Sequence, residues 1–333
     1  MMGNFLNTAE FERAQLERFI QTALEFKQRD RSDRPLTERS VALVFFNPSL
    51  RTRASMQVGI FELGGNAVLL EPGGTSWTLE HAEGAVMDGD KTEHLKEFVR
   101  VLERYVCAIG VRTFAELNDW FIERKDPILS AFAEHATVPV INLESAMHHP
   151  CQAMADMMTI REKFGDEKKK VLLTWAWHPK PLPMAVPNSF ALAAAQFGHD
   201  LRIAHPAGYE LDDDLIRTIE SEAEANGGTV EYTHNVHEAF DEVDVVYAKS
   251  WGSKTFYGAA GTDIAFRADM RNAWIVNEDY MSKTNDAAFM HCLPVRRNVI
   301  VTDAVIDSPS SLVIDEAENR LHVQKAIMTE LIK

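Results

Sequence analysis

The stretch Val41-Ala-Leu-Val-Phe-Phe-Asn-Pro-Ser-Leu-Arg-Thr-Arg-Ala-Ser55 predicts a strand, a tight turn and a helix. Residues 41–46 are an apolar run rich in β-branched and aromatic side chains, which is typical of a strand buried on both faces. Asn47-Pro48 ends the strand, and Ser49 stands where a helix N-cap is expected. Apolar residues at helical spacing then predict a helix over residues 51–63.

The charge at the start of this helix is unusual. Arg51 and Arg53 lie in the first turn, where the helix dipole disfavours cations. A bound anion would reverse the sign, because free backbone N–H groups, two guanidinium groups and the hydroxyls of Ser49, Thr52 and Ser55 would surround it. We therefore predict a phosphate site, with surface arginines on an ordinary helix as the alternative.

Four motifs in one order resemble a known family. Ser49-Leu50-Arg51-Thr52-Arg53 resembles the Ser-Thr-Arg-Thr-Arg phosphate loop of the aspartate and ornithine carbamoyltransferases, with Leu50 in place of a threonine. The other three are Arg112 after a predicted strand, His149-Pro-Cys-Gln152 and His291-Cys-Leu-Pro-Val-Arg-Arg297. Together they cover nearly the whole chain. The resemblance implies transfer of a carbamoyl group from carbamoyl phosphate to an amine, without a cofactor or a metal.

Composition and charge exclude several other classes. The chain has 333 residues, 46% of them hydrophobic and 25% charged, as in a globular protein of two domains. Its net charge of −16 argues against nucleic acid or an anionic membrane as a partner. Three cysteines without a Cys-x-x-Cys pair fit a reducing compartment. We see no signal peptide and no apolar run long enough for a membrane helix, so we expect a cytoplasmic protein.

The order of predicted elements indicates an α/β fold with two doubly wound parallel-sheet domains. Residues 1–150 would bind carbamoyl phosphate, and residues 151–314 would bind the amine, with the C-terminal helix 315–333 packing back on the first domain. In the first domain we predict strands at 41–46, 66–70, 106–111 and 137–142 and helices at 9–28, 51–63, 92–104 and 114–134. In the second we predict strands at 170–176, 200–204, 229–233, 243–248, 274–277 and 287–290 and helices at 151–164, 188–197, 212–226 and 315–332.

The resemblance implies roles for residues at the matching positions. Arg112 follows a strand at its carboxyl end, where α/β sheets place ligands, although a surface salt bridge is the alternative. A hydrogen bond from His149 to the carbamoyl oxygen would stabilise the oxyanion of the tetrahedral intermediate. The catalytic residues would be Arg51, Thr52, Arg112 and His149. The carbamoyl phosphate contacts would be Ser49, Leu50, Arg51, Thr52, Trp77, Arg112, His149, Pro150, Cys151, Gln152, Cys292, Leu293 and Arg320.

Trp77 and Cys292 each allow a second interpretation. Trp77 is isolated in a polar loop and could pack within its own domain, whereas the resemblance implies that its loop enters a neighbouring subunit's site in a homotrimer. His148, His149, His291 and Cys292 could be a zinc site, but there is no closely spaced pair of cysteines and the chemistry needs no metal. Cys292 could be a nucleophile, but the sequence shows no base for it. In the family, backbone carbonyls at the positions of Cys292 and Leu293 orient the amine.

Two segments of the second domain resemble the N-acylornithine branch of the family. These are the proline-rich segment 177–187 and Tyr247-Ala-Lys-Ser-Trp-Gly252. The resemblance implies that acylornithine is bound by Glu144, His178, Lys249, Leu293, Arg296 and Thr92. It also implies a knot, in which the chain near Lys249 passes through the stiff loop 177–187. The alternative is an exposed proline-rich turn beside the cleft.

Thr92 bears on the acyl group. The acetyl branch usually has a glutamate at the position of Thr92 and a lysine at that of Ile300, and both are absent here. A buried glutamate would repel a succinyl carboxylate by roughly 3–4 kcal/mol at 4–5 Å and an effective dielectric of 20. Thr92 removes that repulsion, and Arg296 offers a partner for the added charge. The succinyl branch usually has proline where Thr92 stands, so its pattern is not met in full.

We therefore predict an arginine-biosynthesis enzyme that converts N-succinyl-L-ornithine and carbamoyl phosphate into N-succinyl-L-citrulline and phosphate. N-acetylornithine is the alternative acceptor. A different class, a non-catalytic protein whose two lobes close on an anion, would need neither His149 nor an amine site, and its commonest setting is outside the cytoplasm.

Overall fold

The computed structural model describes residues 3–332, which form two compact units. Unit 1 contains the chain up to Ala115, Phe121–Cys151 and the chain from Arg320 onward. Unit 2 contains Glu116–Trp120 and Gln152–Asn319. Each unit is built on a large all-parallel sheet, so the predicted α/β class with parallel sheets in two domains is confirmed.

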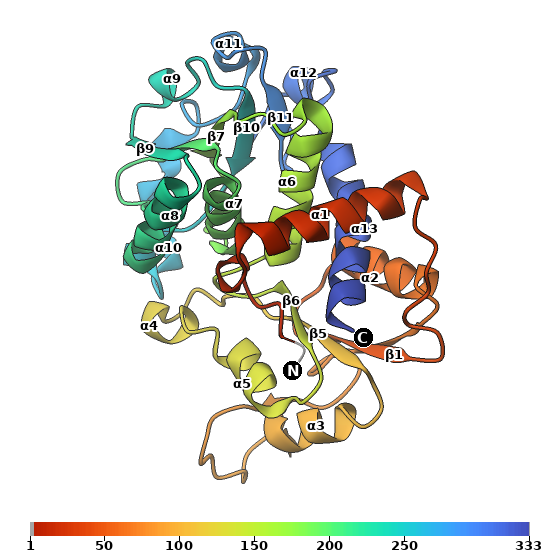
Figure 1. Cartoon of the computed structure of the whole chain (residues 1–333). Helices are drawn as coiled ribbons and strands as arrows, with labels where there is room; N and C mark the ends of the chain where they lie inside the picture. The colour runs from red at the N-terminus through yellow and green to blue at the C-terminus, as the bar shows by residue number, and fades with distance from the viewer. Residues whose placement is uncertain (1–2, 333) are drawn as a thin grey trace. The chain divides into compact units, whose positions relative to one another are not determined.

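The sheet of unit 1 is built around the quoted stretch. Its strand order is β2-β1-β5-β6, with β1 at Ser40–Phe45, β2 at Asn66–Leu70, β5 at Ala108–Arg112 and β6 at Val140–Glu144 (Figure 1). The apolar run forms β1, and its residues from Val41 onward are buried because β2 and β5 flank it on both sides. A parallel sheet aligns the carboxyl ends of its strands, so the segments after β1, β5 and β6 meet at one edge.

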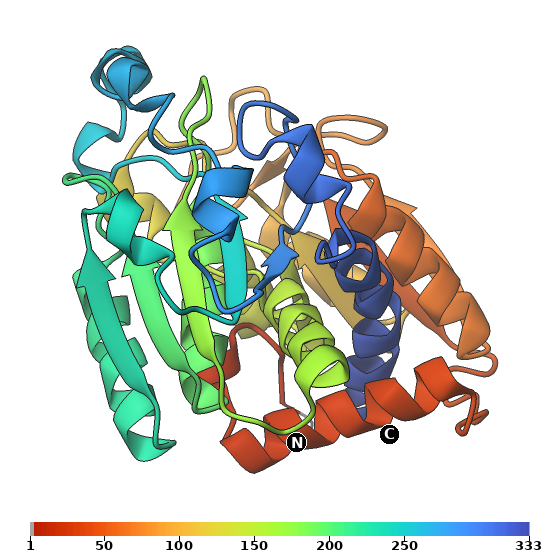
Figure 2. The same cartoon turned by 90° about the horizontal axis from the view of Figure 1, so that it is seen from above.

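Helices cover this sheet. They are α1 (Arg13–Gln28), α2 (Arg51–Glu62), α3 (Leu95–Leu102), α5 (Pro127–His135) and the C-terminal part of α13 (Val313–Leu331). Figures 1 and 2 show α2 beside α13. Gly59 permits this close approach, because a Cβ there would lie 3.3 Å from Cγ of Lys325. The loop between β2 and α3 contains two short paired strands, β3 (Leu79–Glu80) and β4 (Glu93–His94).

Two predictions in unit 1 are wrong in detail. A single helix over 114–134 was expected, but α4 (Trp120–Glu123) and α5 are separate. Asp126 between them has φ of 47°, and Pro127 starts a new helix because it lacks a backbone N–H and fits a first turn. The N-cap position of α2 is Leu50, not Ser49, although Oγ of Ser49 accepts the N–H of Thr52 at 3.3 Å.

The sheet of unit 2 has the order β11-β10-β7-β8-β9. Its strands are β7 (Lys170–Trp175), β8 (Asp200–Ala204), β9 (Thr229–Thr233), β10 (Val245–Lys249) and β11 (Ala288–Met290), and the green to cyan ones lie side by side in Figure 2. Its longer helices are α6 (Pro150–Phe164), α7 (Ala185–Gln196) and α8 (Asp213–Ala225). Its short α-helices include α9 (Val236–Ala239), α10 (Ala260–Phe266), α11 (Glu278–Met281) and α12 (Asp303–Ile306), and the N-terminal part of α13 also belongs to this unit.

Two expectations in unit 2 also need correction. The predicted strand at 274–277 is wrong, since only Val276 pairs there, in an isolated bridge to Val301. The proline-rich segment was expected to be non-helical to residue 187, but α7 already begins at Ala185. Pro187 lies in the first turn of α7, where a missing N–H leaves no helical hydrogen bond unmade.

The proline-rich loop before α7 is held by chain far away in sequence. The N–H of Gly252 donates to the carbonyl of Leu182 at 2.8 Å, and a Cβ on Gly252 would lie 2.9 Å from Cβ of Pro181. The buried Arg267 donates to the carbonyls of His178 at 3.3 Å and Lys180 at 3.1 Å, and to that of Trp251 at 3.2 Å. That the chain passes through this loop stays a prediction.

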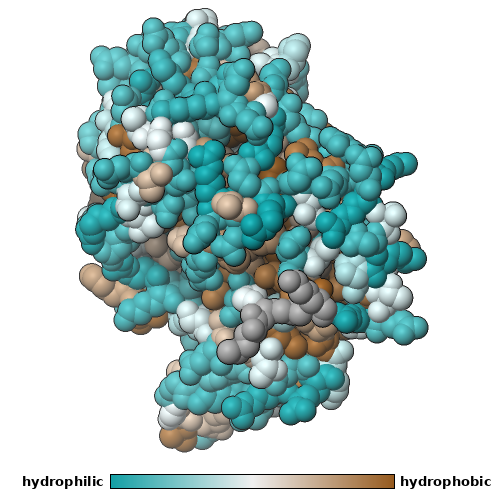
Figure 3. Space-filling view, in the orientation of Figure 1, coloured by the Kyte–Doolittle hydropathy of each residue, from teal (hydrophilic) through white to brown (hydrophobic). Residues whose placement is uncertain are grey.

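Hydrophilic residues cover most of the face seen in Figure 3. Within residues 3–332, every helix is too short or too polar to cross a membrane.

Candidate active site

Two guanidinium groups converge on the first turn of α2. The side chain of Thr52 is buried, and its Oγ1 accepts hydrogen bonds from Nη2 of Arg320 at 2.6 Å and Nη1 of Arg112 at 3.4 Å. Burial lowers the pKa of Arg320, and the charges of Arg112 and Arg51 lower it further, against the opposing effects of Cys151 and Glu144. The first turn of α2 is therefore a concentrated positive region that an anion would stabilise.

Buried donors mark where such an anion would bind. Nε of Arg112 and Nε of Arg320 are both buried, and neither has a hydrogen-bond partner among the described residues. Buried N–H groups are nearly always paired in folded proteins, so these two point to an acceptor supplied by a ligand. Arg112 is also held in place, because its guanidinium lies 4.3 Å from the ring centroid of Phe114.

Glu144 links Arg112 to His149. Its Oε2 lies 2.5 Å from Nη1 of Arg112 and 3.4 Å from Nε2 of His149. The structure thus places Glu144, predicted to bind acylornithine, against two residues predicted to bind carbamoyl phosphate. Its contact with acylornithine stays a prediction. The pairing orients Arg112 at the carboxyl end of β5 and His149 in the turn between β6 and α6.

The turn that carries His149 is held by Asp126, which the sequence analysis did not identify. One oxygen of Asp126 accepts from Oγ of Ser145 at 2.7 Å, and the other accepts from the N–H of Ala146 at 2.7 Å. Burial raises the pKa of Asp126 to about 6, although these hydrogen bonds oppose the shift. The sequence analysis placed Asp126 inside a single helix over 114–134, and no local pattern in the sequence points to its contact with this turn.

Other predicted residues of unit 1 lie around this centre. Pro150 begins α6, and the Sγ–H of the buried Cys151 faces the carbonyl of Asn142 at 3.5 Å. Leu50 holds the N-cap position with its side chain 80% exposed. Their contacts with substrate stay predictions.

Trp77 and Thr92 share the long loop of unit 1. The indole of Trp77 is 56% exposed, and its Nε1 donates to Oε2 of Glu93 at 2.7 Å. Thr92 precedes Glu93 and is exposed. The pairing of β3 with β4 closes the loop and keeps both side chains on its surface. An exposed tryptophan in an ordered loop suits contact with another molecule.

In unit 2, a buried carboxyl pair fixes the side chain of Gln152. Its Nε2 donates to Oδ1 of Asp156 at 2.8 Å and to Oε1 of Glu316 at 3.0 Å. Both amide hydrogens are thus used, and Oε1 of Gln152 is buried without a partner among residues 3–332. That oxygen is an acceptor suited to an N–H group of a ligand.

Glu316 also fixes the His291 loop. Its Oε2 accepts the N–H of His291 at 2.9 Å, and the N–H of Leu293 donates to Nδ1 of His291 at 2.9 Å. Burial raises the pKa of Glu316 well above its usual value, and the neighbouring charge of Asp156 raises it further. The sequence analysis did not identify Glu316 as a residue of the site. Cys292 and Leu293 follow in this loop, and the Leu293–Pro294 peptide bond is cis.

A second positive group gathers in unit 2 around His178. Nε of Arg296 donates to Nε2 of His178 at 3.0 Å, so Nδ1 of His178 carries the proton and donates to the carbonyl of Lys180 at 2.8 Å. Burial lowers the pKa of His178, and the charges of Arg296, Lys249 and Arg267 lower it further, against the effect of the Lys180 carbonyl. His178 follows β7 and Lys249 ends the paired strand β10. The structure thus brings together three of the predicted acylornithine residues, and their contact with a substrate stays a prediction.

The zinc alternative at His148, His149, His291 and Cys292 joins residues of both units and stays untested. In the described part of the chain, the only group of three or more histidine, cysteine, aspartate or glutamate side chains close enough to hold a metal ion lies elsewhere in unit 2, at His205, Glu210 and His234.

Comparison with known proteins agrees with this geometry. Residues 3–162 match the carbamoyl-P binding domain of aspartate/ornithine carbamoyltransferase, and residues 183–331 match its Asp/Orn binding domain. The fold is that of a two-domain α/β protein, and positive side chains gather at the first turn of α2. The chain belongs to the aspartate/ornithine carbamoyltransferase family.

Its relatives include N-acylornithine enzymes. The chain is 46% identical over 335 residues to the N-acetylornithine carbamoyltransferase of Xanthomonas campestris pv. campestris, covering 99% of this chain and 98% of that one. It is 40% identical over 295 residues to the N-succinylornithine carbamoyltransferase of Bacteroides thetaiotaomicron, covering 89% and 88%. The crystal structure of acetylornithine transcarbamylase complexed with acetylcitrulline superposes with a TM-score of 0.97 at 46% identity, over 99% of both chains.

Proposed function

We propose that this protein transfers the carbamoyl group of carbamoyl phosphate to the side-chain amine of N-succinyl-L-ornithine, giving N-succinyl-L-citrulline and phosphate in arginine biosynthesis. The observation that carries the transferase assignment is the pair of buried Nε–H donors of Arg112 and Arg320 at the first turn of α2. The family and its N-acylornithine relatives support the same reaction.

The residues of unit 1 act on carbamoyl phosphate. The phosphate binds Arg112, Arg320, Arg51 and the backbone N–H groups of the first turn of α2. His149, oriented by Glu144, donates a hydrogen bond to the carbamoyl oxygen and stabilises the negative charge that develops there. These donors are already in place before the reaction, so they need not move as negative charge develops on the substrate. Such pre-organised electrostatic stabilisation is usually the largest contribution to the rate of an enzyme reaction.

The residues of unit 2 act on the amide and the acceptor. Oε1 of Gln152 accepts a hydrogen bond from the carbamoyl NH₂ group. Lys249, Arg296 and the neutral His178 bind the carboxylates of the acylornithine. The neutral amine attacks the carbonyl carbon to form the C–N bond, the C–O bond to phosphate breaks, and the amine proton leaves with the phosphate.

The charges of the side chains near the acceptor site support a succinyl group on the substrate. Arg296 lies in the cationic group at His178, and Thr92 brings no negative charge where the acetyl branch usually has a glutamate. A relative at 45% identity and a TM-score of 0.96 is a variant of N-acetyl-L-ornithine transcarbamylase with one glutamate replaced by proline, complexed with carbamyl phosphate and N-succinyl-L-norvaline. A neutral side chain is thus compatible with a succinyl compound in that protein.

N-acetyl-L-ornithine is the second candidate acceptor. The N-acetylornithine relatives share 46% identity over 99% of this chain, against 40% over 89% for the N-succinylornithine relative. A panel of three amines decides between them. Ornithine, N-acetylornithine and N-succinylornithine are each incubated with carbamoyl phosphate, and the citrulline-type product is measured.

We expect the highest kcat/KM for N-succinylornithine and hardly any product from ornithine. A higher kcat/KM for N-acetylornithine would reassign the acyl group. Saturable binding of carbamoyl phosphate without product from any amine would instead support the non-catalytic anion-binding class.

A further inference from the structure

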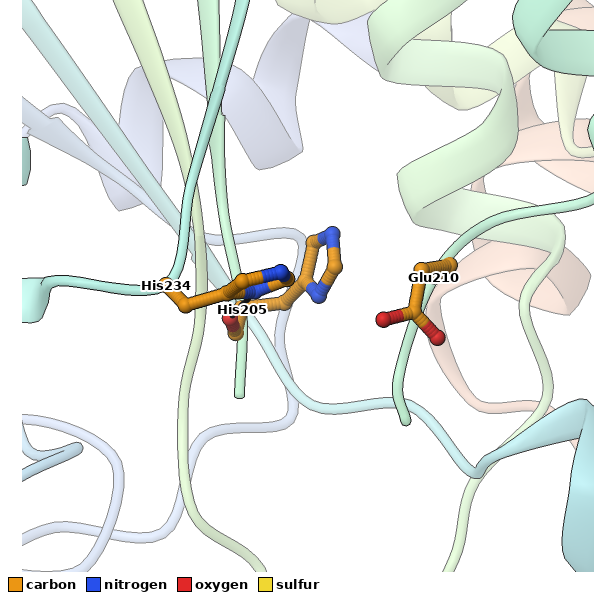
Figure 4. Close-up of side chains that lie close together, drawn as sticks. All are labelled: His205, Glu210 and His234. Carbon is orange, nitrogen blue, oxygen red and sulfur yellow. Dashed lines mark hydrogen bonds between the residues drawn. The ribbon is translucent and has the colours of Figure 1, made fainter. Parts of the chain in front are cut away.

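A second cluster of ionisable side chains lies in unit 2, formed by His205, Glu210 and His234. His205 directly follows β8, and His234 directly follows the neighbouring strand β9. Glu210 belongs to the loop between β8 and α8. Figure 4 shows its carboxylate turned toward the two imidazole rings. One ligand atom from each of the three residues lies within 4.8 Å of the other two.

Backbone carbonyls hold both histidines in one tautomer. Nδ1 of His205 donates to the carbonyl of Pro206 at 2.9 Å, and Nδ1 of His234 donates to the carbonyl of His205 at 2.9 Å. Each ring therefore keeps the lone pair of Nε2 for another partner. Metal-binding histidines almost always donate their other ring N–H to such an acceptor, which fixes the ring orientation and makes the ligating nitrogen more basic.

The carboxylate of Glu210 is also oriented by a backbone hydrogen bond. One oxygen of Glu210 accepts the N–H of Gly208 at 2.9 Å, which leaves its second oxygen for a ligand. Burial raises the pKa of Glu210, but the backbone N–H groups of Gly208 and Glu210 and the two histidines outweigh it, so the net pKa is lowered. Burial lowers the pKa of His205. A neutral imidazole and an ionised carboxylate are the forms that bind a metal.

We propose that His205, Glu210 and His234 bind one zinc ion, or a chemically similar late first-row divalent cation. Two imidazole nitrogens and one carboxylate oxygen suit such ions, whereas Mg²⁺ and Ca²⁺ prefer oxygen ligands alone. Tetrahedral ligands about 2.0–2.1 Å from zinc lie about 3.3 Å apart, so small rotations of Glu210 and the exposed His234 complete the site. Because His234 is exposed, the fourth ligand is water.

The ion would tie the β8–α8 loop to the end of β9. This loop also carries Tyr209, whose carbonyl accepts the indole N–H of Trp251 at 2.8 Å and whose hydroxyl donates to Asp263 at 2.7 Å. Trp251 follows Lys249 by two residues. The loop thus supports the segment that carries a predicted acceptor residue. The metal would stabilise this support and has no part in the transfer reaction.

The test uses the full-length protein without a histidine tag. It is stripped of metal by chelator and titrated with ZnCl₂, with bound zinc measured after equilibrium dialysis and melting temperature measured in parallel. His234→Ala and Glu210→Gln remove ligands from the exposed side of the site. His237→Ala is the matched control, because His237 is an exposed histidine three residues further along. CoCl₂ replaces ZnCl₂ in a second titration, since cobalt in a tetrahedral site of nitrogen and oxygen ligands absorbs visible light.

We expect one zinc per chain in the parent protein and His237→Ala, a melting temperature raised by the metal, and visible cobalt absorption. Each ligand variant should bind zinc at least about tenfold more weakly and lose the gain in melting temperature. Equal zinc affinity in the parent and both ligand variants would overturn the proposal. So would a parent protein that binds less than one zinc per chain at all concentrations tested.

Discussion

At the scale of single residues, Glu316 shows most clearly how the fold controls the protonation state of a side chain. Burial and the charge of Asp156 raise its pKa in the folded state above the value in the unfolded chain. The contribution of Glu316 to the free energy of unfolding is therefore fully present below its pKa in the unfolded chain, about 4.3. It is lost as pH rises through its pKa in the folded protein. Folding takes up a proton between these two values.

We expect Glu316→Gln to remove this pH dependence, because the glutamine side chain cannot ionise and its one oxygen can still accept from the His291 N–H. In the parent protein the free energy of unfolding should fall by up to about 1.4 kcal/mol per pH unit above pH 5 for this one group. Urea denaturation across a pH series measures the slope. Glu318→Gln, an exposed change on the same helix, is the control and should keep the parent slope. An unchanged slope in Glu316→Gln would show that Glu316 does not hold the proton.

Thr92 gives a second prediction at this scale. Thr92→Glu should lower kcat/KM for N-succinylornithine several-fold more than kcat/KM for N-acetylornithine, because it restores a like charge near the succinyl carboxylate and water screens part of that repulsion at an exposed position. Thr92→Ser keeps the side chain neutral and is the control. The KM for carbamoyl phosphate should stay unchanged in both variants. Equal losses for the succinyl and acetyl substrates would mean that residue 92 does not distinguish the acyl groups.

The residues found from the sequence are those that the chemistry of a motif makes recognisable. Arg112 and Arg320 were predicted from motifs, and the structure places both against Thr52. Asp126 and Glu316 were missed, because each acts through a partner distant in sequence. Gln152 and Glu316 are 164 positions apart. A carboxyl group that orients another side chain has no local pattern, so only the fold reveals it.

At the scale of elements, Arg267 in the segment after α10 holds the proline-rich loop. Three backbone carbonyls accept from its guanidinium, and Nε donates to Asp263 at 2.7 Å. Arg267→Lys keeps the charge but cannot reach all of these acceptors. We expect a loss of about 2 kcal/mol or more in stability, from buried carbonyls left unpaired.

Because the loop carries His178, Arg267→Lys should also raise the KM for the acylornithine several-fold. Binding of carbamoyl phosphate, measured by calorimetry, should be retained and shows that unit 1 is folded. Arg271→Lys is the control. Arg271 also contacts the proline-rich loop, because its guanidinium lies over the ring of Trp177, but it does not make the buried carbonyl contacts that Arg267 makes. An unchanged acceptor KM would mean that Arg267 does not position His178.

The strands were predictable because a parallel sheet buried on both faces leaves continuous apolar runs in the sequence. The run at 41–46 differs from β1 by one residue at each end. Helix 114–134 was misjudged because apolar spacing alone does not show that Asp126 adopts a left-handed conformation. The apolar residues at 274–277 indicated a strand, but only Val276 pairs, in a single backbone bridge to Val301. The spacing of apolar residues cannot show how far such pairing extends.

At the scale of the whole molecule, we propose a homotrimer in which Trp77 completes a neighbouring subunit's site. The exposed indole, held by Glu93, supports this assignment. Trp77→Ala and Arg51→Ala should each be nearly inactive alone. Mixed trimers, assembled by dissociation and reassociation, should recover part of the activity, because some sites receive an intact Trp77 and an intact Arg51.

Each variant taken alone through the same dissociation and reassociation is the control. Mass spectrometry verifies that mixed trimers have formed. If verified mixed trimers stay inactive, Trp77 serves only the site of its own subunit. If the parent protein sediments as a monomer, the trimer itself is wrong.

The proton on Glu316 also has a thermal consequence. When the chain unfolds at a pH between the unfolded and folded pKa values of this group, the released proton is taken up by the buffer, which gives out its own heat of protonation. Scanning calorimetry in an amine buffer and in phosphate should therefore return different apparent unfolding enthalpies for one protein at one pH. The difference, divided by the difference between the two buffer heats, counts the protons that the folded molecule carries in excess.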